Sequence, residues 1–308
     1  MKMIRHTILV TGANGQLGTE MRNLAAEHAD WKDVRFIFTD INDVPGADTV
    51  KLDITDEEAV LDKVREENVD IIVNCAAYTD VEKAEGNPEI ADMLNHLAVA
   101  WLADAASVCG ATLIQISTDY VFGGDACEPY SETSETNPLG VYGVSKLAGE
   151  RAVINSGCNY LIFRTAWLYS PYGKNFVKTM RRLTSEKESL NVVFDQTGSP
   201  TYARDLAELI FNVIETGQTG RSGIYHFTDE GVCSWYDFAK AICSKSGNVC
   251  DIRPCRSSEY PTRAERPHYS VLDKSLVRKT FGITIPYWTD SLDKCLERIS
   301  SGEGNGNV

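Results

Sequence analysis

The chain has 308 residues and a formal net charge of −14, with 43% hydrophobic and 24% charged residues. These values are ordinary for a globular protein that buries a sizeable core, in one large domain or in two smaller ones. The negative charge disfavours non-specific binding to nucleic acid or to an anionic membrane, so we expect neither as a partner. An anionic substrate would have to be held by locally placed cations and backbone N–H groups.

The apolar runs and the cysteines predict a cytoplasmic location. No apolar run approaches the roughly 20 residues that a spanning helix needs. The run Ile8–Val10 leads directly into Thr11-Gly12, which fits a first strand better than a secretory signal. The nine cysteines are an odd number without close metal-binding pairs, which favours reduced thiols and no metal site.

The first half of the chain alternates short β-branched runs with longer amphipathic stretches. Apolar runs without alternation, such as Ile71-Ile72-Val73, are typical of strands covered on both faces. Strand–helix alternation of this kind predicts an α/β fold with a Rossmann-type, doubly wound parallel sheet. The expected strands are 7–10, 34–39, 70–75, 112–117 and 160–164, and the expected helices are 16–29, 56–68, 88–109 and 141–155.

After about residue 170 the spacing of the elements loosens, and proline and aromatic residues increase between Pro254 and Tyr287. Strand and helix signals continue at 190–194, 203–215, 224–228 and 235–245. We therefore predict a smaller mixed α/β substrate-binding lobe that is interleaved with the main sheet. Residues 1–170 with about 201–228 are assigned to the dinucleotide-binding domain, and about 171–200 with 229–308 to the lobe.

A glycine motif follows the first predicted strand and opens the first predicted helix. Gly12 permits a tight turn, Gly15 lets the backbone approach a pyrophosphate, and Gly18 allows close helix–strand packing. The start of the helix adds N–H groups and a positive dipole. The motif predicts a dinucleotide site whose cofactor-binding residues here are Gly12, Asn14, Gly15, Gln16, Leu17 and Gly18.

Two acidic positions follow later apolar segments. Asp40 ends the second predicted strand, 22 residues beyond Gly18, where a carboxylate can accept a hydrogen bond from a ribose 2′-OH and would repel a 2′-phosphate. Asp40 therefore favours NADH over NADPH, although a solvated loop aspartate is the alternative interpretation. Asp53, with Ile54, could reach the adenine edge of the cofactor.

A candidate catalytic set lies at the fourth strand and the helix after residue 140. Tyr142 and Lys146 are four residues apart, so both side chains share one helix face. A free phenol has a pKa near 10, and a nearby ammonium lowers it toward the working range. Thr118, at the carboxyl end of its strand, can place its hydroxyl against a reacting carbonyl oxygen.

The glycine motif, Asn74-Cys75-Ala76-Ala77, Ser117-Thr118-Asp119 and the Tyr142–Lys146 pair together resemble the extended short-chain dehydrogenase/reductases. Further stretches in both parts of the chain resemble the dTDP-4-dehydrorhamnose reductase family within that class. The resemblance runs from about residue 7 to residue 295, and these further stretches are 78–85, 117–124, 137–143, 164–169, 195–201 and 266–273.

The resemblance implies an NADPH- or NADH-dependent enzyme that reduces the C4 keto group of dTDP-4-dehydro-L-rhamnose to give dTDP-L-rhamnose. It makes Thr118, Tyr142 and Lys146 the catalytic residues, with Lys146 also anchoring the nicotinamide ribose. Arg266 would hold the nucleotide moiety of the substrate. The resemblance further places Ala76 and Ala77 at the cofactor, and Thr79, Val81, Asp119, Tyr120 and Trp167 at the sugar.

Two residues depart from what the family leads us to expect. Cys75 stands where the family usually has alanine, and this small side chain should be tolerated. Asp40 favours NADH, whereas reductases of this family often use NADPH or accept both. Some relatives bind magnesium at a dimer interface, which leaves magnesium and a homodimer open here without identifying ligands.

Two other functions stay open. A nucleotide-sugar dehydratase would carry an Asp-Glu pair after the threonine, but Tyr120 follows Asp119 here, which argues against dehydration. An epimerase with tightly held NAD is less sharply excluded. A non-catalytic regulatory subunit of the methionine adenosyltransferase type also resembles these reductases, and an intact Tyr142–Lys146 pair does not exclude it.

Overall fold

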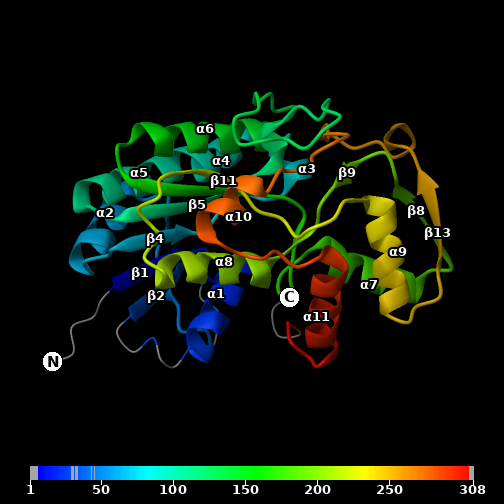
Figure 1. Cartoon of the computed structure of the whole chain (residues 1–308), viewed down its shortest axis with the longest axis horizontal. Coiled ribbons are helices and arrows are strands. Elements are labelled where there is room, and N and C mark those ends of the chain that lie inside the picture. The colour runs from blue at the N-terminus through cyan, green and yellow to red at the C-terminus, as the bar shows by residue number, and fades with distance from the viewer. Residues whose placement is uncertain (1–5, 29–30, 32–33, 43, 45, 305–308) are drawn as a thin grey trace.

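The computed structural model describes residues 6–304 apart from 29–30, 32–33, 43 and 45. Its centre is a seven-stranded sheet in the order β11-β6-β5-β4-β1-β2-β3, and all neighbouring strands are parallel. Figure 1 shows the sheet between two layers of helices, which is the predicted α/β Rossmann-type fold. The strands are β1 (His6–Thr11), β2 (Val34–Asp40), β3 (Val50–Lys51), β4 (Ile71–Asn74), β5 (Thr112–Thr118), β6 (Asn159–Thr165) and β11 (Gly223–His226).

The two faces of the sheet carry separate apolar cores. Helices α1 (Gln16–Glu27) and α8 (Ala203–Glu215) cover one face. Helices α2 (Glu57–Glu66), α5 (Ala98–Cys109) and α6 (Val141–Asn155) cover the other face. The central strands are therefore buried on both sides, which explains their continuous apolar sequences.

The helix expected over 88–109 is interrupted. Helix α4 (Pro88–Asp92) and helix α5 are joined by a π-helical turn at Met93–Leu97. In this turn Asn95 binds the N–H and the C=O of Tyr78 at 2.9 and 3.0 Å and donates to Ser145 Oγ at 3.1 Å. A side chain at Gly149 of α6 would collide with the Asn95 carbonyl oxygen, so the turn packs directly against that helix. Hydrophobic periodicity does not reveal a turn of this kind.

A second layer of structure lies beside the sheet. Helices α7 (Phe176–Glu186), α9 (Trp235–Lys245) and α11 (Trp288–Ser300) enclose a third apolar core with the parallel pair β8 (Ser189–Val193) and β13 (Asp251–Cys255). Figure 1 shows these elements together at one end of the molecule. Two short pairs complete this part: β7 (Leu168–Tyr169) with β10 (Thr201–Tyr202), and β9 (Thr197–Gly198) with β12 (Cys233–Ser234).

The chain passes between the sheet and this smaller part more than once. Helix α8 and strand β11 belong to the main sheet and its cover, and helix α10 (Ser275–Phe281) also contributes Val277 and Phe281 to the core beside the sheet. The division into a dinucleotide-binding domain and a substrate-binding lobe stays a prediction, and its segment 229–308 includes α10. The elements that the sequence did not suggest are β3, α3 (Val81–Ala84), α7, α10, α11, β13 and the short pairs.

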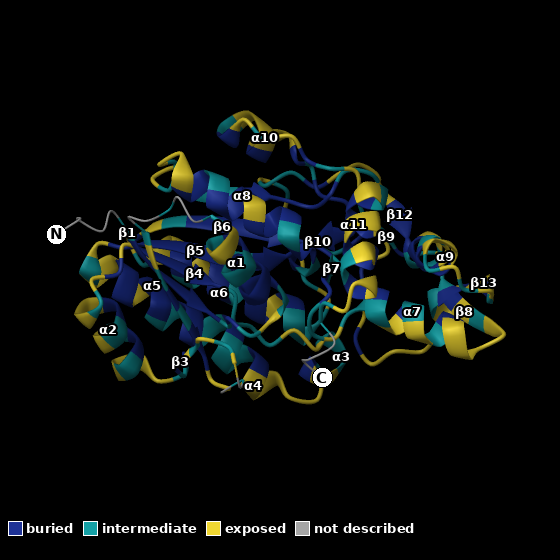
Figure 2. Cartoon of the chain, turned by 90° about the horizontal axis from the view of Figure 1, so that it is seen from below, coloured by how far each residue is buried: buried dark blue, intermediate teal, exposed yellow. Residues whose placement is uncertain are grey.

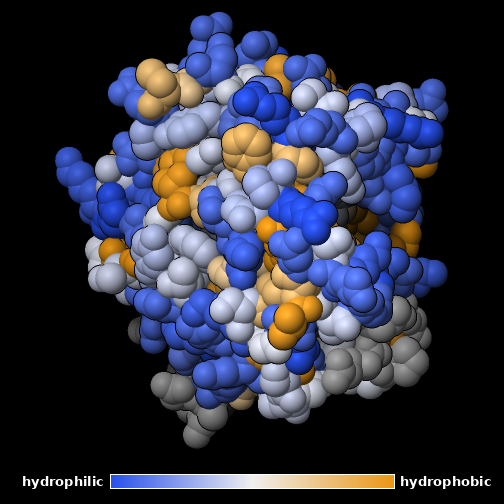
Figure 3. All heavy atoms as spheres, turned by 90° about the vertical axis from the view of Figure 1, so that its right-hand side faces the viewer, coloured by the Kyte–Doolittle hydropathy of each residue, from blue (hydrophilic) through white to orange (hydrophobic). Residues whose placement is uncertain are grey.

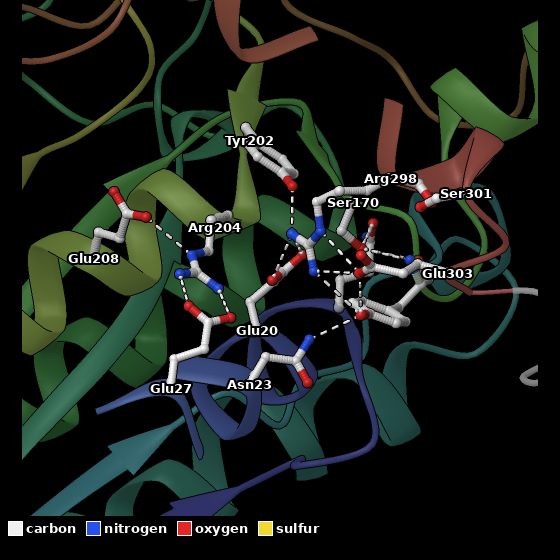
Figure 4. Close-up of polar contacts among 12 residues, drawn as sticks. Glu20, Asn23, Glu27, Ser170, Tyr202, Arg204, Glu208, Arg298, Ser301 and Glu303 are labelled. Atoms are coloured by element: carbon white, nitrogen blue, oxygen red, sulfur yellow. Dashed lines mark hydrogen bonds and ion pairs between the residues drawn. The ribbon is translucent and has the colours of Figure 1, made fainter. Parts of the chain in front are cut away.

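A buried ion pair joins the first helix to the last. Glu20 of α1 is fully buried, and both of its carboxylate oxygens accept hydrogen bonds from Arg298 Nη1 of α11 at 2.9 Å. Arg298 also donates to Tyr202 Oη at 2.5 Å and to Glu303 Oε2 at 2.8 Å. Figure 4 shows the guanidinium at the centre of these contacts. Burial raises the pKa of Glu20, and Arg298 opposes that shift.

Buried and exposed residues are distributed in the same way in the sheet and in the smaller part. Figure 2 shows buried residues concentrated along the sheet and between the helices of the smaller part, with exposed residues on the outer turns. On the face that the smaller part presents in Figure 3, hydrophilic side chains dominate and apolar ones lie in separate groups. Within the part of the chain that the structure describes, no helix combines the length and the apolar character needed to cross a bilayer.

Candidate functional site

The glycine turn between β1 and α1 forms one wall of the site. Gly12 has a left-handed backbone with φ of +62°, and a Cβ there would lie 2.6 Å from the backbone nitrogen of Ala76. A Cβ at Gly18 would collide with the carbonyl oxygen of Gly12. Helix α1 begins after Gly15, which has no side chain to cap it. The first N–H groups of α1 are therefore left for a ligand, as an anionic pyrophosphate requires.

A cavity of about 640 Å³ opens at the carboxyl ends of β1, β4 and β5, where the strand order reverses. Ligands of doubly wound sheets bind at this reversal. Residues of the smaller part, including Trp167 and Trp235, close its other side. The cavity is lined by fourteen of the predicted site residues: Gly15, Gln16, Leu17, Ala76, Ala77, Thr79, Val81, Thr118, Asp119, Tyr120, Tyr142, Lys146, Trp167 and Arg266.

The other predicted cofactor residues lie outside the lining of this cavity. Gly12, Asn14 and Gly18 belong to the glycine turn and the start of α1 but do not contact the cavity. Asp40 ends β2, and its carboxylate accepts hydrogen bonds from the backbone N–H groups of Asn14 and Asn42, both at 3.0 Å. Asp40 thus ties the glycine turn to the second strand, a contact that the sequence did not suggest.

Asp53 and Ile54 are also absent from the cavity lining. The Asp53 carboxylate accepts from the N–H and the hydroxyl of Thr55, at 2.9 and 2.7 Å. The side chain of Ile54 is buried in the core on the α2 and α5 face of the sheet. Their placement at the adenine edge stays a prediction.

The candidate catalytic side chains meet at one side of the cavity. Thr118 ends β5, while Tyr142 and Lys146 lie on the first two turns of α6. The Lys146 ammonium donates a 2.6 Å hydrogen bond to the carbonyl oxygen of Ile116. The ring of Tyr142 stands edge-on to Tyr120, with 5.6 Å between the ring centroids.

Burial controls the protonation of this set. It raises the pKa of Tyr142 to about 12, and the Thr118 hydroxyl opposes the shift. Burial lowers the pKa of Lys146 to about 8, and Glu150 opposes that shift. The sequence suggested that Lys146 lowers the pKa of Tyr142. Burial opposes that effect in this structure, and the lowering of the Tyr142 pKa by Lys146 and a bound nicotinamide stays a prediction.

Asp119 is the carboxylic acid of the cavity. Its Oδ1 accepts a hydrogen bond from Thr118 Oγ1 at 3.0 Å, and burial raises its pKa to about 6. Its Oδ2 is buried and has no hydrogen-bond partner within the described chain.

The substrate side of the cavity is built by short structures. Helix α3 starts after Asp80, whose carboxylate caps the N–H of Lys83 at 3.1 Å, and this start carries Thr79 and Val81 into the cavity. Arg266 reaches the same side and is held by Glu82 through a 2.8 Å ion pair. These contacts place a guanidinium beside apolar and hydroxyl side chains.

Two aromatic rings form the outer wall. Trp167 stacks on Trp235 with 3.6 Å between the ring centroids and 12° between the ring planes. Trp167 also has a φ of +49°, a left-handed conformation that is rare for a bulky residue and is concentrated at functional sites. No motif in the sequence indicated Trp235 or Lys174, which both line the cavity. The only signal for Trp235 was its place at the start of a predicted helix.

The parallel sheet reverses its strand order beside the glycine turn, and Thr118, Tyr142 and Lys146 lie at this reversal. These features place the chain among the extended short-chain dehydrogenase/reductases. A family profile described as the RmlD substrate binding domain matches residues 6–301. The chain belongs to this family, that of the dTDP-4-dehydrorhamnose reductases.

Individual relatives agree with this membership. A dTDP-4-dehydrorhamnose reductase of Aggregatibacter actinomycetemcomitans is 38% identical over 92% of this chain and 96% of its own. The crystal structure of a dTDP-4-dehydrorhamnose reductase from Clostridium acetobutylicum aligns with a TM-score of 0.88 and 41% identity, covering 96% of this chain and 99% of that chain. The Bacillus anthracis reductase, solved in complex with NADP, aligns with a TM-score of 0.86 and 37% identity over 95% of this chain and 99% of that one.

Proposed function

We propose that this protein reduces the C4 keto group of dTDP-4-dehydro-L-rhamnose to give dTDP-L-rhamnose, with NADPH or NADH as the reductant. The observation that carries the proposal is a single cavity. It receives the uncapped start of α1 on one side, the set Thr118, Tyr142 and Lys146 in the middle, and Arg266 on the other side. Family membership supplies the substrate class, since the relatives are named for this reaction.

The glycine turn fits a nicotinamide dinucleotide, because its tight backbone, which Cβ atoms at Gly12 and Gly18 would disrupt, presents the uncapped start of α1 to the cavity. Gly15, Gln16 and Leu17 would bind the pyrophosphate through the N–H groups that open α1, and Lys146 would hold the nicotinamide ribose. When bound, the cofactor supplies a hydride to the C4 carbon of the sugar.

The protein supplies the matching proton. Tyr142 donates its phenolic proton to the C4 oxygen. The Thr118 hydroxyl, which donates to Asp119 Oδ1 in this structure, would turn to donate its proton to that oxygen as negative charge develops on it. The pKa of Tyr142, raised to about 12, keeps the phenol protonated at neutral pH, which is the form that a reduction consumes. One hydride and one proton convert the ketone into the alcohol.

The substrate would lie against the smaller part of the molecule. Arg266 and the exposed Lys174 would bind the diphosphate, and Trp167 would pack on the sugar. Thr79, Val81, Asp119 and Tyr120 would complete the sugar pocket. Among the residues that the structure describes, no group of three or more acidic, histidine or cysteine side chains could hold a metal, so we assign no magnesium ligand. The homodimer and the cytoplasmic location stay predictions.

The test follows absorbance at 340 nm with purified protein, dTDP-4-keto-6-deoxy-glucose and a 3,5-epimerase, with NADH and NADPH in parallel. We expect oxidation of the cofactor that requires the epimerase. Absence of oxidation with both cofactors would overturn the proposal. NAD retained through purification together with epimerisation would instead favour the epimerase, and stable capture of a methionine adenosyltransferase without turnover would favour the regulatory subunit.

The choice between the two cofactors can be tested at Asp40. Under the proposal its carboxylate faces the 2′ position of the adenosine ribose, where it repels a phosphate. Replacing Asp40 with asparagine removes one charge and keeps an oxygen that can accept from the Asn14 N–H, at the loss of the acceptor for the Asn42 N–H. We expect affinity for NADPH relative to NADH to rise by about fivefold, equivalent to about 1 kcal/mol. Fluorescence titration gives both dissociation constants.

The control for this experiment is Asp56→Asn, which removes an exposed carboxylate that caps the N–H of Ala59 at the start of α2 instead of binding the glycine turn. The affinity ratio should not change in this variant. An equal ratio in the wild-type protein and in Asp40→Asn would show that the Asp40 carboxylate does not select the cofactor.

A further inference from the structure

One face of α6 continues the catalytic set into the core. Tyr142, Lys146 and Glu150 follow at intervals of four residues, so their side chains lie on one side of the helix, toward the sheet. Tyr142 and Lys146 line the cavity, and Glu150, which is only 2% exposed, lies one turn further from it. The function proposed above assigns no role to Glu150.

The Glu150 carboxylate is fixed from two strands. Arg164 of β6 donates from Nε to Oε1 at 2.9 Å and from Nη2 to Oε2 at 2.6 Å. Ser117 of β5 donates its hydroxyl to Oε1 at 2.5 Å. Ser117 and Arg164 are register partners across β5 and β6, and Ser117 directly precedes Thr118. The carboxylate therefore ties α6 to the strand that carries the catalytic threonine.

Arg164 is itself held in a fixed position. Its guanidinium lies over the ring of Phe122, 5.1 Å from the centroid, and Nη1 donates to Nε2 of His226 at 3.4 Å. Burial and the Arg164 charge lower the pKa of His226 to about 3, so this histidine is neutral. The buried Glu150–Arg164 pair is therefore closed on its far side by a neutral ring and an aromatic face.

Several other charged groups on the elements around α6 have partners of their own. Glu85, after α3, accepts from the N–H of Val141 at 2.8 Å. Asp92 and His96, on α4 and the π-helical turn, pair with each other near the surface at 2.9 Å. Glu82 pairs with Arg266 at the far side of the cavity. Asp119, after β5, is bound by Thr118.

Glu150 is thus the buried anion closest along α6 to the ammonium of Lys146. Its attraction raises the pKa of Lys146 against the lowering effect of burial, which brings that pKa to about 8. A group poised this near neutrality loses its proton if the compensating charge is removed.

We propose that Glu150, fixed by Arg164 and Ser117, is a positioning residue for Lys146 and keeps the buried ammonium charged while the reduction takes place. The link to reduction rests on the proposed function, whereas the effect on the charge of Lys146 does not. The neutral form of Lys146 would lose its attraction for the ribose hydroxyls and for negative charge that develops near Tyr142.

The first experiment measures Lys146 directly in the whole protein. Lysine labelled with ¹³C at Cε is followed by NMR as a function of pH, and the Lys146 signal is identified by its loss in Lys146→Met. In Glu150→Gln we expect Lys146 to titrate about one pH unit or more below its wild-type midpoint. Lys146 is charged when protonated, so a lower pKa means that, as the pH is raised, the variant loses this charge at a lower pH than the wild-type protein does.

The same variant is then assayed for reduction across pH 6 to 9. We expect the alkaline loss of kcat/KM to move to lower pH together with the Lys146 midpoint. A residue with a purely structural role would lower kcat/KM by a constant factor at every pH. That constant factor, or an unchanged Lys146 midpoint, would overturn the proposal.

A second variant covers the case in which Glu150→Gln does not fold, since it leaves Arg164 buried and unpaired. The double variant Glu150→Gln/Arg164→Met removes both charges, and we expect Lys146 to titrate below wild type but above the single variant. Glu132→Gln is the control, because Glu132 is a half-buried acid that accepts from the His226 N–H, away from Lys146. If the wild-type protein shows no turnover while Glu150→Gln still lowers the Lys146 midpoint, the proposed function is refuted and the effect of Glu150 on the charge of Lys146 is supported.

Discussion

Tyr142→Phe is expected to lower kcat by a factor of about 10² to 10⁴, the usual contribution of a positioned general acid. The ring of Tyr142 packs edge-on against Tyr120, and phenylalanine preserves that contact while removing the proton donor. The affinity for NADPH and NADH should stay close to wild type, since the glycine turn and Lys146 are untouched. Steady-state assays at 340 nm and fluorescence titration measure the two quantities.

The control is Tyr260→Phe, which removes a phenol from an exposed tyrosine outside the cavity lining. It should leave kcat unchanged. Wild-type turnover in Tyr142→Phe would remove Tyr142 from the catalytic set. A loss of cofactor affinity that matches the loss of kcat would assign Tyr142 to binding instead of to proton transfer.

Arg298→Met is expected to lower the free energy of unfolding by about 3 to 5 kcal/mol, because it leaves a fully buried carboxylate without its partner. That carboxylate is Glu20, whose two oxygens both bind the Arg298 guanidinium in the wild-type protein. The pair links α1 to α11, so its loss weakens the attachment of the smaller part to the sheet. Urea or thermal unfolding followed by circular dichroism measures the change.

Two further variants distinguish the effect of leaving the Glu20 carboxylate buried without a partner from the effect of simply losing the arginine side chain. In Glu20→Gln/Arg298→Met both charges are gone, and the destabilisation should be clearly smaller than in Arg298→Met. Arg35→Met breaks the partly exposed pair with Glu67 and should cost about 0 to 1 kcal/mol. Equal losses in Arg298→Met and Arg35→Met would contradict the account of a buried charge.

The deficit of Arg298→Met should also depend on pH. Burial raises the pKa of Glu20 in the folded protein above its ordinary value of 4.5, and the loss of Arg298 raises it further. A carboxyl group with a raised pKa favours the folded state at low pH, and that contribution is lost as the pH rises through the folded-state pKa. The deficit relative to wild type should therefore be smallest in acid and should grow toward neutral pH.

The parts of the fold that follow local rules were predictable from the sequence. Helices α6, α8 and α9 have the bounds that their periodicity suggested, and the glycine turn lies between β1 and α1 as expected. Buried parallel strands carry continuous apolar runs, and amphipathic helices carry a periodic stripe. Fourteen of the predicted site residues line one cavity because the strand ends of a doubly wound sheet converge there.

The parts that depend on tertiary contacts were not predictable. The turn at Met93–Leu97 widens because Asn95 binds Tyr78 and α6 across the fold, and periodicity carries no trace of such contacts. Strand β13 is short, contains Pro254 and pairs with β8 from far along the chain. Burial raises the pKa of Tyr142, and burial is a property of the folded chain that local spacing does not give.

The left-handed conformation of Trp167 restricts how the outer wall of the cavity can change during evolution. A Cβ at Gly198 would lie 2.9 Å from the Trp167 ring, and Trp235 stacks on that ring. The residues at positions 167, 198 and 235 are therefore coupled through packing, because a change at one of them alters the space at another. A homologue adapted to a bulkier sugar should change positions 167, 198 and 235 together, and a single exchange at Gly198 should be rare among functional descendants.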